Sequence, residues 1–381
     1  MTVPPSAPAP ADRDDSEVVI RRPLASFRSS TTVSTVNDSA VSTVNDSVRP
    51  PQEHSENPRV LLVGAFDDAM HAHAALRRRA LERLGCRVSS FNLVGTGGLL
   101  SRLRRVGLSD RMARALRHTD PAIVLVLEGS QLPPELVAEL KRDSTALWVN
   151  WFCDERRTHA SISALAAAYD VVFVAGSAVA ETSETFGLPP IRYLPPGCDP
   201  SVHRPMRSRD QFRANVVFAG TATPHRERLL SELVEFGLAV WGPGWRKTKL
   251  RDYCRGELLD HCDYIRAYAG ASVAVNVQCS GDSNGADPGC NRRLFELAAI
   301  GVPQVVEDRP DIHRHFREGS EILVARSPAD FKGLLAEALQ DRAWSEQVAA
   351  GARQRALTEH TYMHRLAALL RDVGVVQPLL V

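Results

Sequence analysis

The sequence predicts an α/β protein with two doubly wound domains that face a central cleft, behind a disordered amino-terminal tail. From residue 59 onward, short apolar and β-branched runs alternate with segments of helical periodicity, as in parallel sheets covered by helices. A segment with several prolines and a glycine at 194–205 divides this alternation into two series. The length of 381 residues also suits two domains of roughly 100–200 residues each. We therefore expect domains at 59–200 and 201–381.

The tail is expected at residues 1–58, a segment with eight of the 24 prolines and many serines and threonines. It contains an octapeptide repeat, in which residues 33–40 are followed by the nearly identical residues 41–48. Such a segment buries too little apolar surface to offset the entropy lost on ordering. Two copies are too few for a solenoid, so we interpret the repeat as a duplication in an unconstrained linker.

The elements of both series follow from this alternation. In the first series, strands are expected at 60–63, 87–91, 123–127, 146–151, 171–174 and 191–194, and helices at 69–84, 99–117, 134–141 and 178–186. In the second, strands are expected at 216–219, 238–241, 272–277, 303–306 and 322–324, and helices at 224–235, 260–268, 292–300, 328–339, 343–357 and 361–371. Open α/β sheets bind ligands at the carboxyl ends of their strands, so the cleft is the expected site.

Composition disfavours several classes of protein. Forty-six lysines and arginines against 45 acidic residues leave a net charge of +1, so no global field attracts nucleic acid. The seven scattered cysteines include no Cys-x-x-Cys pair, which argues against disulfides or structural zinc and for reduced thiols. No apolar run approaches the ~18 residues that span a bilayer. We expect a cytoplasmic protein without stable membrane insertion.

Two nucleotide-binding fingerprints are missing from the sequence. The first expected strand runs into Gly64-Ala-Phe66-Asp67-Asp68, with one glycine where a dinucleotide-binding domain carries three. The glycines at 95, 97 and 98 follow the second strand instead, and no P-loop is present. Nicotinamide redox chemistry and P-loop phosphoryl transfer are therefore disfavoured.

The most discriminating segment is 291–306, with Glu296 early in a helix and Gly301 and Pro303 closing it. It resembles the donor-site helix of GT-B glycosyltransferases, where Glu-Ala-x-Ala-x-Gly-x-Pro recurs. Its Asn-x-Arg-x-Phe-Glu beginning is similar to the spore-maturation, CgeB-like branch. Further pieces resemble that branch in the same order, at 194–200, 217–230, 241–245 and 359–365. The resemblance covers 191–370 well and 59–190 only in outline.

The resemblance implies a donor site in the second domain. Glu296 would accept hydrogen bonds from a ribose diol, although it also suits the helix dipole. Arg293 and Arg226 would neutralise a nucleotide diphosphate, with backbone N–H groups of the loop that begins at Gly220. The chain has 42 arginines and four lysines, so each of these two is alternatively a solvated surface residue.

Two asparagines complete the expected donor site. Asn291 is expected to hold the sugar or the pyrophosphate, or else to cap the helix, and Asn276 to face the cleft or to satisfy a loop. Many retaining GT-B enzymes carry a second glutamate eight positions before the first, where this chain has Pro288. The sugar contact and the stereochemical outcome therefore stay open.

The first domain is expected to supply the acceptor side. Asp68, in the loop after the first strand, and Asp154, after the fourth, are the two candidate catalytic bases. Asp154 follows Cys153, where many GT-B proteins have histidine, and His71 with His73 forms a metal pair only as a minor alternative. Trp151 either stacks on a sugar or an aglycone or, like Trp148, packs in the core.

The resemblance implies a metal-independent, hexosyltransferase-like enzyme without a cofactor. Its donor is a nucleotide sugar, and its acceptor is an unidentified glycan, protein or small molecule. A non-catalytic nucleotide-sugar-binding or structural GT-B protein and a nucleotide-sugar epimerase are the alternatives. Donor turnover with and without an acceptor separates the three.

Deleting residues 1–55 should leave the melting temperature and donor affinity unchanged, because a disordered tail contributes no core contacts. Thermal unfolding of the truncated and full-length proteins measures the melting temperature. A large drop in melting temperature would refute the interpretation of this segment as a tail.

Overall fold

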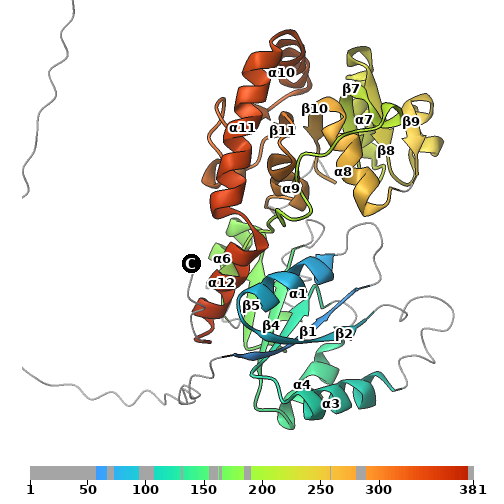
Figure 1. The fold of residues 1–381 in the computed structure, drawn as a ribbon. Helices are drawn as coiled ribbons and strands as arrows, with labels where there is room; N and C mark the ends of the chain where they lie inside the picture. The colour runs from blue at the N-terminus through green and yellow to red at the C-terminus, as the bar shows by residue number, and fades with distance from the viewer. Residues whose placement is uncertain are drawn as a thin grey trace, which may run out of the picture. The chain divides into compact units, whose positions relative to one another are not determined.

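The computed structural model describes residues 57–66, 73–93, 107–129, 132–153, 162, 165–183, 190–257, 259–279 and 289–375. Residues 1–56 of the expected tail lie outside them. The described elements form two six-stranded sheets with helices packed on them (Figure 1). No helix in this part of the chain is long and apolar enough to cross a bilayer.

The first sheet has six parallel strands in the order β2-β1-β3-β4-β5-β6. Its strands are β1 (Arg59–Gly64), β2 (Arg87–Asn92), β3 (Ile123–Leu127), β4 (Leu147–Phe152), β5 (Val171–Val174) and β6 (Ile191–Tyr193). Its helices are α1 (His73–Arg83), α3 (Leu108–Thr119), α4 (Pro134–Arg142) and α6 (Ser177–Ser183). The strand order reverses between β1 and β3, which marks the switch point of a doubly wound sheet.

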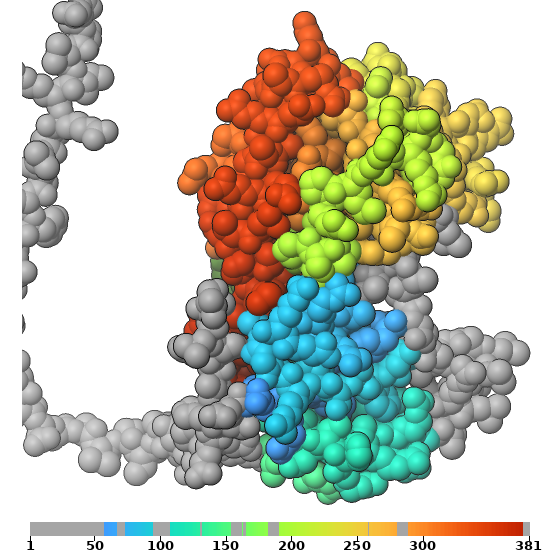
Figure 2. Space-filling view, viewed as in Figure 1, coloured from blue at the N-terminus to red at the C-terminus, as the bar shows by residue number. Residues whose placement is uncertain are grey.

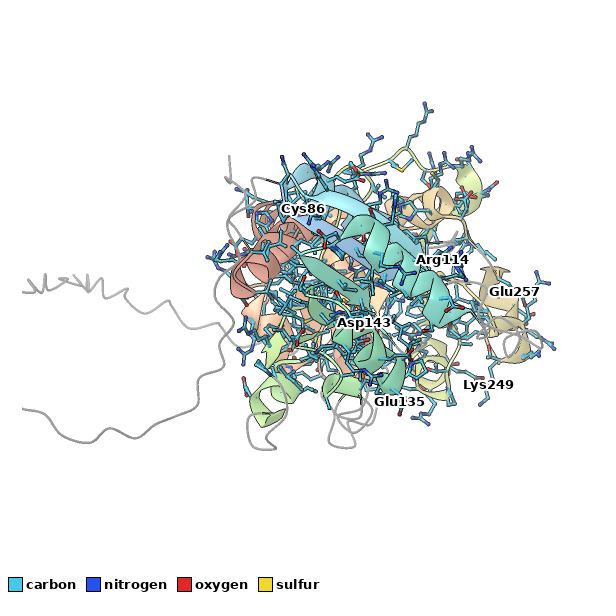
Figure 3. The ribbon with its side chains drawn as sticks, turned by 90° about the horizontal axis from the view of Figure 1, so that it is seen from below. Cys86, Arg114, Glu135, Asp143, Lys249 and Glu257 are labelled. Atoms are coloured by element: carbon cyan, nitrogen blue, oxygen red, sulfur yellow. The ribbon has the colours of Figure 1, made fainter. Side chains whose placement is uncertain are left out.

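Alternate residues of β1 belong to two cores, one on each face of the sheet. Val60 and Leu62 lie in one core and Leu61 and Val63 in the other, each at most 1% exposed. Burial on both faces excludes polar residues and accounts for the continuous apolar run in the sequence. On α3 and α4, the outward side chains are polar, as labelled Arg114 and Glu135 show (Figure 3).

The second sheet repeats the parallel arrangement in the order β12-β11-β10-β7-β8-β9. Its strands are β7 (Ala214–Ala219), β8 (Leu238–Trp241), β9 (Cys254–Gly256), β10 (Ala271–Asn276), β11 (Gln304–Glu307) and β12 (Leu323–Ala325). Its helices are α7 (Pro224–Ser231), α8 (His261–Ala269), α9 (Arg292–Ile300), α10 (Pro328–Gln340) and α11 (Arg342–Glu359). Short 3₁₀ helices lie at Asp210–Phe212, Val234–Phe236, Trp245–Lys247, Arg251–Tyr253 and Pro310–Arg314.

The predicted α/β class with two doubly wound sheets is confirmed, with a few local differences. Strand β9 was not expected, because its sequence Cys-Arg-Gly lacks the apolar, β-branched residues that marked the other strands. The helix expected at 224–235 ends at Ser231 and gives way to a 3₁₀ turn closed by Gly237, whose φ of 73° is left-handed. The helix expected at 99–117 begins at Leu108 in the described part, after Gly107 with a φ of 97°.

The last helix, α12 (Tyr362–Asp372), departs from the expected domain at 201–381. Its side chains Tyr362, Leu366 and Leu370 share a buried cluster with Val60 and Leu62 of β1. An amphipathic period shows that a helix has an apolar face but not which core receives it. The remaining parts of the expected domain boundaries stay predictions.

The segment at 194–205 does more than link two sheets. Cys198 forms a β-bridge with Thr361, in which Cys198 N–H donates to the His360 carbonyl (3.0 Å) and Tyr362 N–H donates to the Cys198 carbonyl (2.8 Å). A Cβ at Gly197 would lie 2.7 Å from the same His360 carbonyl, so only glycine fits. Figure 2 shows the yellow-green chain that follows this segment at the surface beside the red carboxy-terminal helices.

Two histidines lie beside this bridge, His360 buried and His315 partly buried. His360 donates from Nε2 to the His315 carbonyl (3.0 Å) and accepts from Arg365 at Nδ1 (3.1 Å), which defines a neutral ring. His315 Nε2 lies 2.7 Å from the Tyr193 hydroxyl of β6. Burial is the main cause that lowers the pKa of His315 to about 3 and that of His360 to about 4. The folded protein therefore holds both rings neutral.

Stability should fall as the pH drops from about 6.5 toward 4, because unfolding lets both histidines take up protons at their ordinary pKa. The loss is on the order of 2 kcal/mol for each ring at about pH 4.5. Urea unfolding at about pH 7 and 4.5 measures it. His360→Gln should show a shallower pH dependence than the wild type, and His118→Gln, which changes an exposed histidine, should not. Identical pH profiles for wild type and His360→Gln would contradict the assignment.

Candidate functional site

The candidate site lies at the carboxyl edge of the second sheet. There, Gly220 follows β7, Asn276 ends β10 and Glu307 ends β11, and the amino-terminal turn of α9 begins at Arg292. Parallel strands bring these chain segments to the same edge, although they are far apart in the sequence. Five of the six expected donor residues, all but Glu296, lie in the strand end, loops and helix starts at this edge.

Asn291 is the N-cap of α9, as one of the two interpretations predicted. Its Oδ1 accepts a hydrogen bond from Leu294 N–H (3.1 Å), and its Nδ2 donates to Asn276 Oδ1 (2.8 Å) and Gln278 Oε1 (3.1 Å). Asn276 and Gln278 are each 4% exposed. The three amides thus fix the start of α9 against the end of β10, and a contact of either asparagine with the donor stays a prediction.

Arg293 lies between Asn276 and Gly220. Its Nη1 donates to Asn276 Oδ1 (3.2 Å), and its guanidinium lies over the Phe218 ring, 4.9 Å from the centroid. A Cβ at Gly220 would come within 2.8 Å of Arg293 Nη2. Glycine at 220 therefore lets a partly exposed cation lie directly against the loop after β7.

Arg226 is buried, with 2% of its surface exposed, so the solvated-surface alternative is wrong for this residue. Its guanidinium donates to the carbonyls of Thr221 (3.0 Å), Val277 (3.1 Å) and Gln278 (3.0 Å). The loop after β7 and the loop after β10 are thereby held to one another by a single cation. The guanidinium also lies over the Phe218 ring, 5.2 Å from the centroid. Contact of Arg226 with a diphosphate stays a prediction.

The motif at 241–245 supports the loop that begins at Gly220. Trp245 Nε1 donates to the Gly220 carbonyl (2.7 Å), and Ala222 N–H donates to the Pro243 carbonyl (3.0 Å). Gly242 has a φ of 128°, and a Cβ there would lie 2.2 Å from the Gly220 oxygen. The motif therefore determines the path of a neighbouring loop.

Glu296 is buried in the second turn of α9, with 3% of its surface exposed. Tyr264 of α8 donates from its hydroxyl to Glu296 Oε2 (2.8 Å), and His203 Nε2 lies 3.8 Å from Oε1. Burial and then the Glu296 charge raise the pKa of Tyr264 well above its ordinary value, so this phenol stays a donor. The helix-dipole alternative explains little, because that effect fades beyond the first turn.

The sequence did not predict Glu307, a carboxylate at this edge. Glu307 Oε1 lies 2.9 Å from His225 Nε2, and Glu307 Oε2 accepts from Gln278 N–H (3.0 Å). Burial opposes ionisation, yet these two hydrogen bonds and the nearby Arg309 lower the pKa of Glu307 below its ordinary value. No motif pointed to this residue, since its partners come together only when β11, α7 and the loop after β10 meet.

Tyr264 and His203 were also missed. Tyr264 lies on the apolar face of α8, where an aromatic side chain is normally taken as core, and His203 lies in a segment interpreted as a linker. No sequence motif links the two residues, because a histidine and a tyrosine 61 positions apart form no recognisable pattern. Only the fold brings them to one carboxylate.

The acceptor-side predictions fall mainly on other parts of the chain. Asp68, His71 and Asp154 lie outside the described residues, as does Pro288. Among the described residues, no group of three histidine, cysteine or acidic side chains is arranged to hold a metal. His73 is described and starts α1.

The end of β4 favours packing over sugar contact for both tryptophans. Trp148 and Trp151 are each 0% exposed, and Trp151 Nε1 donates to the Leu194 carbonyl (2.9 Å). The core-packing alternative is therefore correct for these two residues. Burial raises the pKa of Cys153 to about 12, so this side chain is a neutral thiol, and its Sγ accepts from Arg77 (3.2 Å).

Comparison with known proteins agrees with this fold. Residues 225–371 match the model of a family described as "Glycosyl transferase-like". A sucrose-phosphate synthase from Thermosynechococcus elongatus is similar in structure, with a TM-score of 0.61 and 13% identity over 83% of this chain and 99% of that one. HepE from Anabaena in complex with UDP-glucose has a TM-score of 0.60 and 12% identity over 83% and 100%.

A glycosyltransferase from Rickettsia africae is similar as well, with a TM-score of 0.58 and 9% identity over 84% of this chain and 99% of that one. No curated protein matches this chain in sequence. At these identities the structures establish the fold alone. The described chain therefore has the GT-B fold of glycosyltransferases, and its residues 225–371 match the glycosyl transferase-like family.

Proposed function

We propose that this protein transfers a hexosyl group from a nucleotide-sugar donor to an acceptor hydroxyl or amine, as a CgeB-like GT-B enzyme of the cytoplasm. The observation that supports this most is the set of polar groups at the carboxyl edge of the second sheet, inside the segment that matches the family. The similar protein HepE is described in complex with UDP and with UDP-glucose. A nucleotide sugar bound at the same edge is our proposal for this chain.

Glu296 is the proposed ribose contact. A carboxylate accepts two hydrogen bonds from a vicinal diol, and Tyr264 engages one of its oxygens from the side of α8. Because 3% of Glu296 is exposed, this contact requires a neighbouring side chain to shift when the nucleotide enters. Tyr264 would then hold the carboxylate in one rotamer.

The diphosphate is proposed to lie between Arg293 and the loop that begins at Gly220. Arg293 is partly exposed, and it reaches this loop because Gly220 has no side chain. Helix α7 begins beside the loop, with Thr223 as its N-cap, so its amino-terminal dipole favours the same anion. Arg226 would position this loop through its carbonyl contacts, and Asn291 and Asn276 would hold Arg293 and the start of α9.

Negative charge develops on the diphosphate as the sugar leaves, and a preorganised cation lowers the barrier for that step. The acceptor proton would pass to a carboxylate of the first domain, for which Asp68 and Asp154 remain our candidates. Binding of a panel of nucleotide sugars, followed by turnover with and without acceptors, tests the whole proposal. Binding without turnover favours a non-catalytic protein, and turnover without acceptor favours an epimerase or hydrolase.

Replacing Glu296 with glutamine should weaken binding of UDP about 10- to 100-fold, because hydrogen bonds to a charged group contribute about 1.5–3 kcal/mol. Calorimetric titration measures the affinity, and melting curves measure stability. Glu337→Gln, which changes an exposed glutamate of α10, is the matched control. Equal affinities in wild type and Glu296→Gln would remove Glu296 from the donor site.

Transfer activity should survive EDTA, because arginine and helix termini rather than a metal ion would stabilise the departing diphosphate. The assay compares initial rates with and without chelator. Loss of activity with rescue by Mn²⁺ or Mg²⁺ would overturn this prediction and return His71, His73 and Asp154 to consideration as ligands.

A further inference from the structure

A tight turn at residues 199–203 holds His203 against the donor-site helix. Val202 and His203 N–H groups both donate to the Asp199 carbonyl (3.0 and 2.7 Å), and Ser201 N–H donates to Asp199 Oδ1 (2.9 Å). Asp199 is 3% exposed and His203 1%. A turn with this many internal hydrogen bonds leaves the ring of His203 little freedom.

The turn is also attached to α1 of the first sheet. Arg79 donates to Ser201 Oγ (2.8 Å) and lies 3.7 Å from Asp199 Oδ2, and Arg83 lies 3.8 Å from Asp199 Oδ1. These contacts compensate the buried Asp199 charge and anchor the turn from a second element. Contacts with α1 of the first sheet therefore help to fix the position of His203.

The hydrogen bonds determine where the proton of the His203 ring lies. Asp199 N–H donates to His203 Nδ1 (3.0 Å), so Nδ1 is an acceptor and the proton is on Nε2. Burial lowers the pKa of His203, although Glu296 acts in the opposite direction, so the ring is neutral. The edge of His261 packs against it, with ring centroids 5.7 Å apart.

The nitrogen that carries this proton lies near the carboxylate on which the proposed function depends. His203 Nε2 lies 3.8 Å from Glu296 Oε1, while Tyr264 donates to Oε2. This inference rests on the proposed function: we propose that His203 is a positioning residue for donor binding, whose Nε2–H orients the Glu296 carboxylate through Oε1 while Tyr264 engages Oε2. The carboxylate then keeps one rotamer.

Two amide variants separate positioning from packing. Glutamine can place an amide N–H near the position of Nε2, whereas asparagine reaches only the position of Nδ1, and neither keeps the ring. His203→Asn should weaken UDP binding about tenfold, and His203→Gln should stay within about threefold of wild type. Calorimetric titration gives the affinities, and melting curves show how much stability each variant loses.

A double-mutant cycle tests whether His203 acts through Glu296. In the Glu296→Gln background, His203→Asn should cause little further loss of UDP affinity. Full additivity of the two losses, or equal affinities for the asparagine and glutamine variants, would overturn the positioning role.

A spectroscopic measurement does not depend on nucleotide binding. Nitrogen-15 NMR of the imidazole should show His203 protonated at Nε2 alone near neutral pH, with a resonance that shifts in Glu296→Gln. An unprotonated Nε2, or an Nε2 resonance unaffected by Glu296→Gln, would overturn the inference. Failure of the wild type to bind UDP or any other nucleotide of the panel would instead overturn the proposed function.

Discussion

The candidate site depends on the hydrogen bonds that the buried guanidinium of Arg226 donates to two loops. Loops at the ends of β7 and β10 turn several carbonyl groups inward, and a buried carbonyl without a donor destabilises the fold. Arg226 supplies donors to Thr221, Val277 and Gln278 together. Without Arg226, both loops would lose the hydrogen bonds that fix their backbone conformations.

The two loops that Arg226 joins in turn hold the start of α9 and Arg293 in place. The end of β10 presents Asn276 to Asn291, which caps α9, and Asn276 also accepts from Arg293. The loop after β7 keeps Gly220 against the same arginine. Neutral amides and carbonyls thus position the two arginines of the site, whose guanidinium groups both lie against the Phe218 ring.

Much of the fold was predictable from the sequence, because strands buried on both faces show long apolar runs, as β3 and β5 do. The motifs were predictable too, but several of them mark residues that shape the backbone, such as Gly242, Trp245 and Asn291. The hydrogen-bond partners of the site residues were not predictable from the sequence. Arg226 and Arg293 look equivalent in a chain with 42 arginines, and only the fold shows that one is buried under carbonyls while the other stays partly exposed. Tyr264 and His203 gave no signal, since their common partner is distant in sequence.

The return of α12 to the first sheet means that the chain crosses between the two sheets twice, once near Cys198 and once near Thr361. These crossings are hydrogen-bonded to each other in a β-bridge. A single strand between two bodies permits rotation about every axis, but two strands joined side by side resist twisting and permit bending mainly about one axis. Any opening between the two sheets would therefore bend this paired crossing, where a Cβ at Gly197 would lie 2.7 Å from the His360 carbonyl. It would also break the buried hydrogen bonds that Ser177 of α6 donates to Asp311.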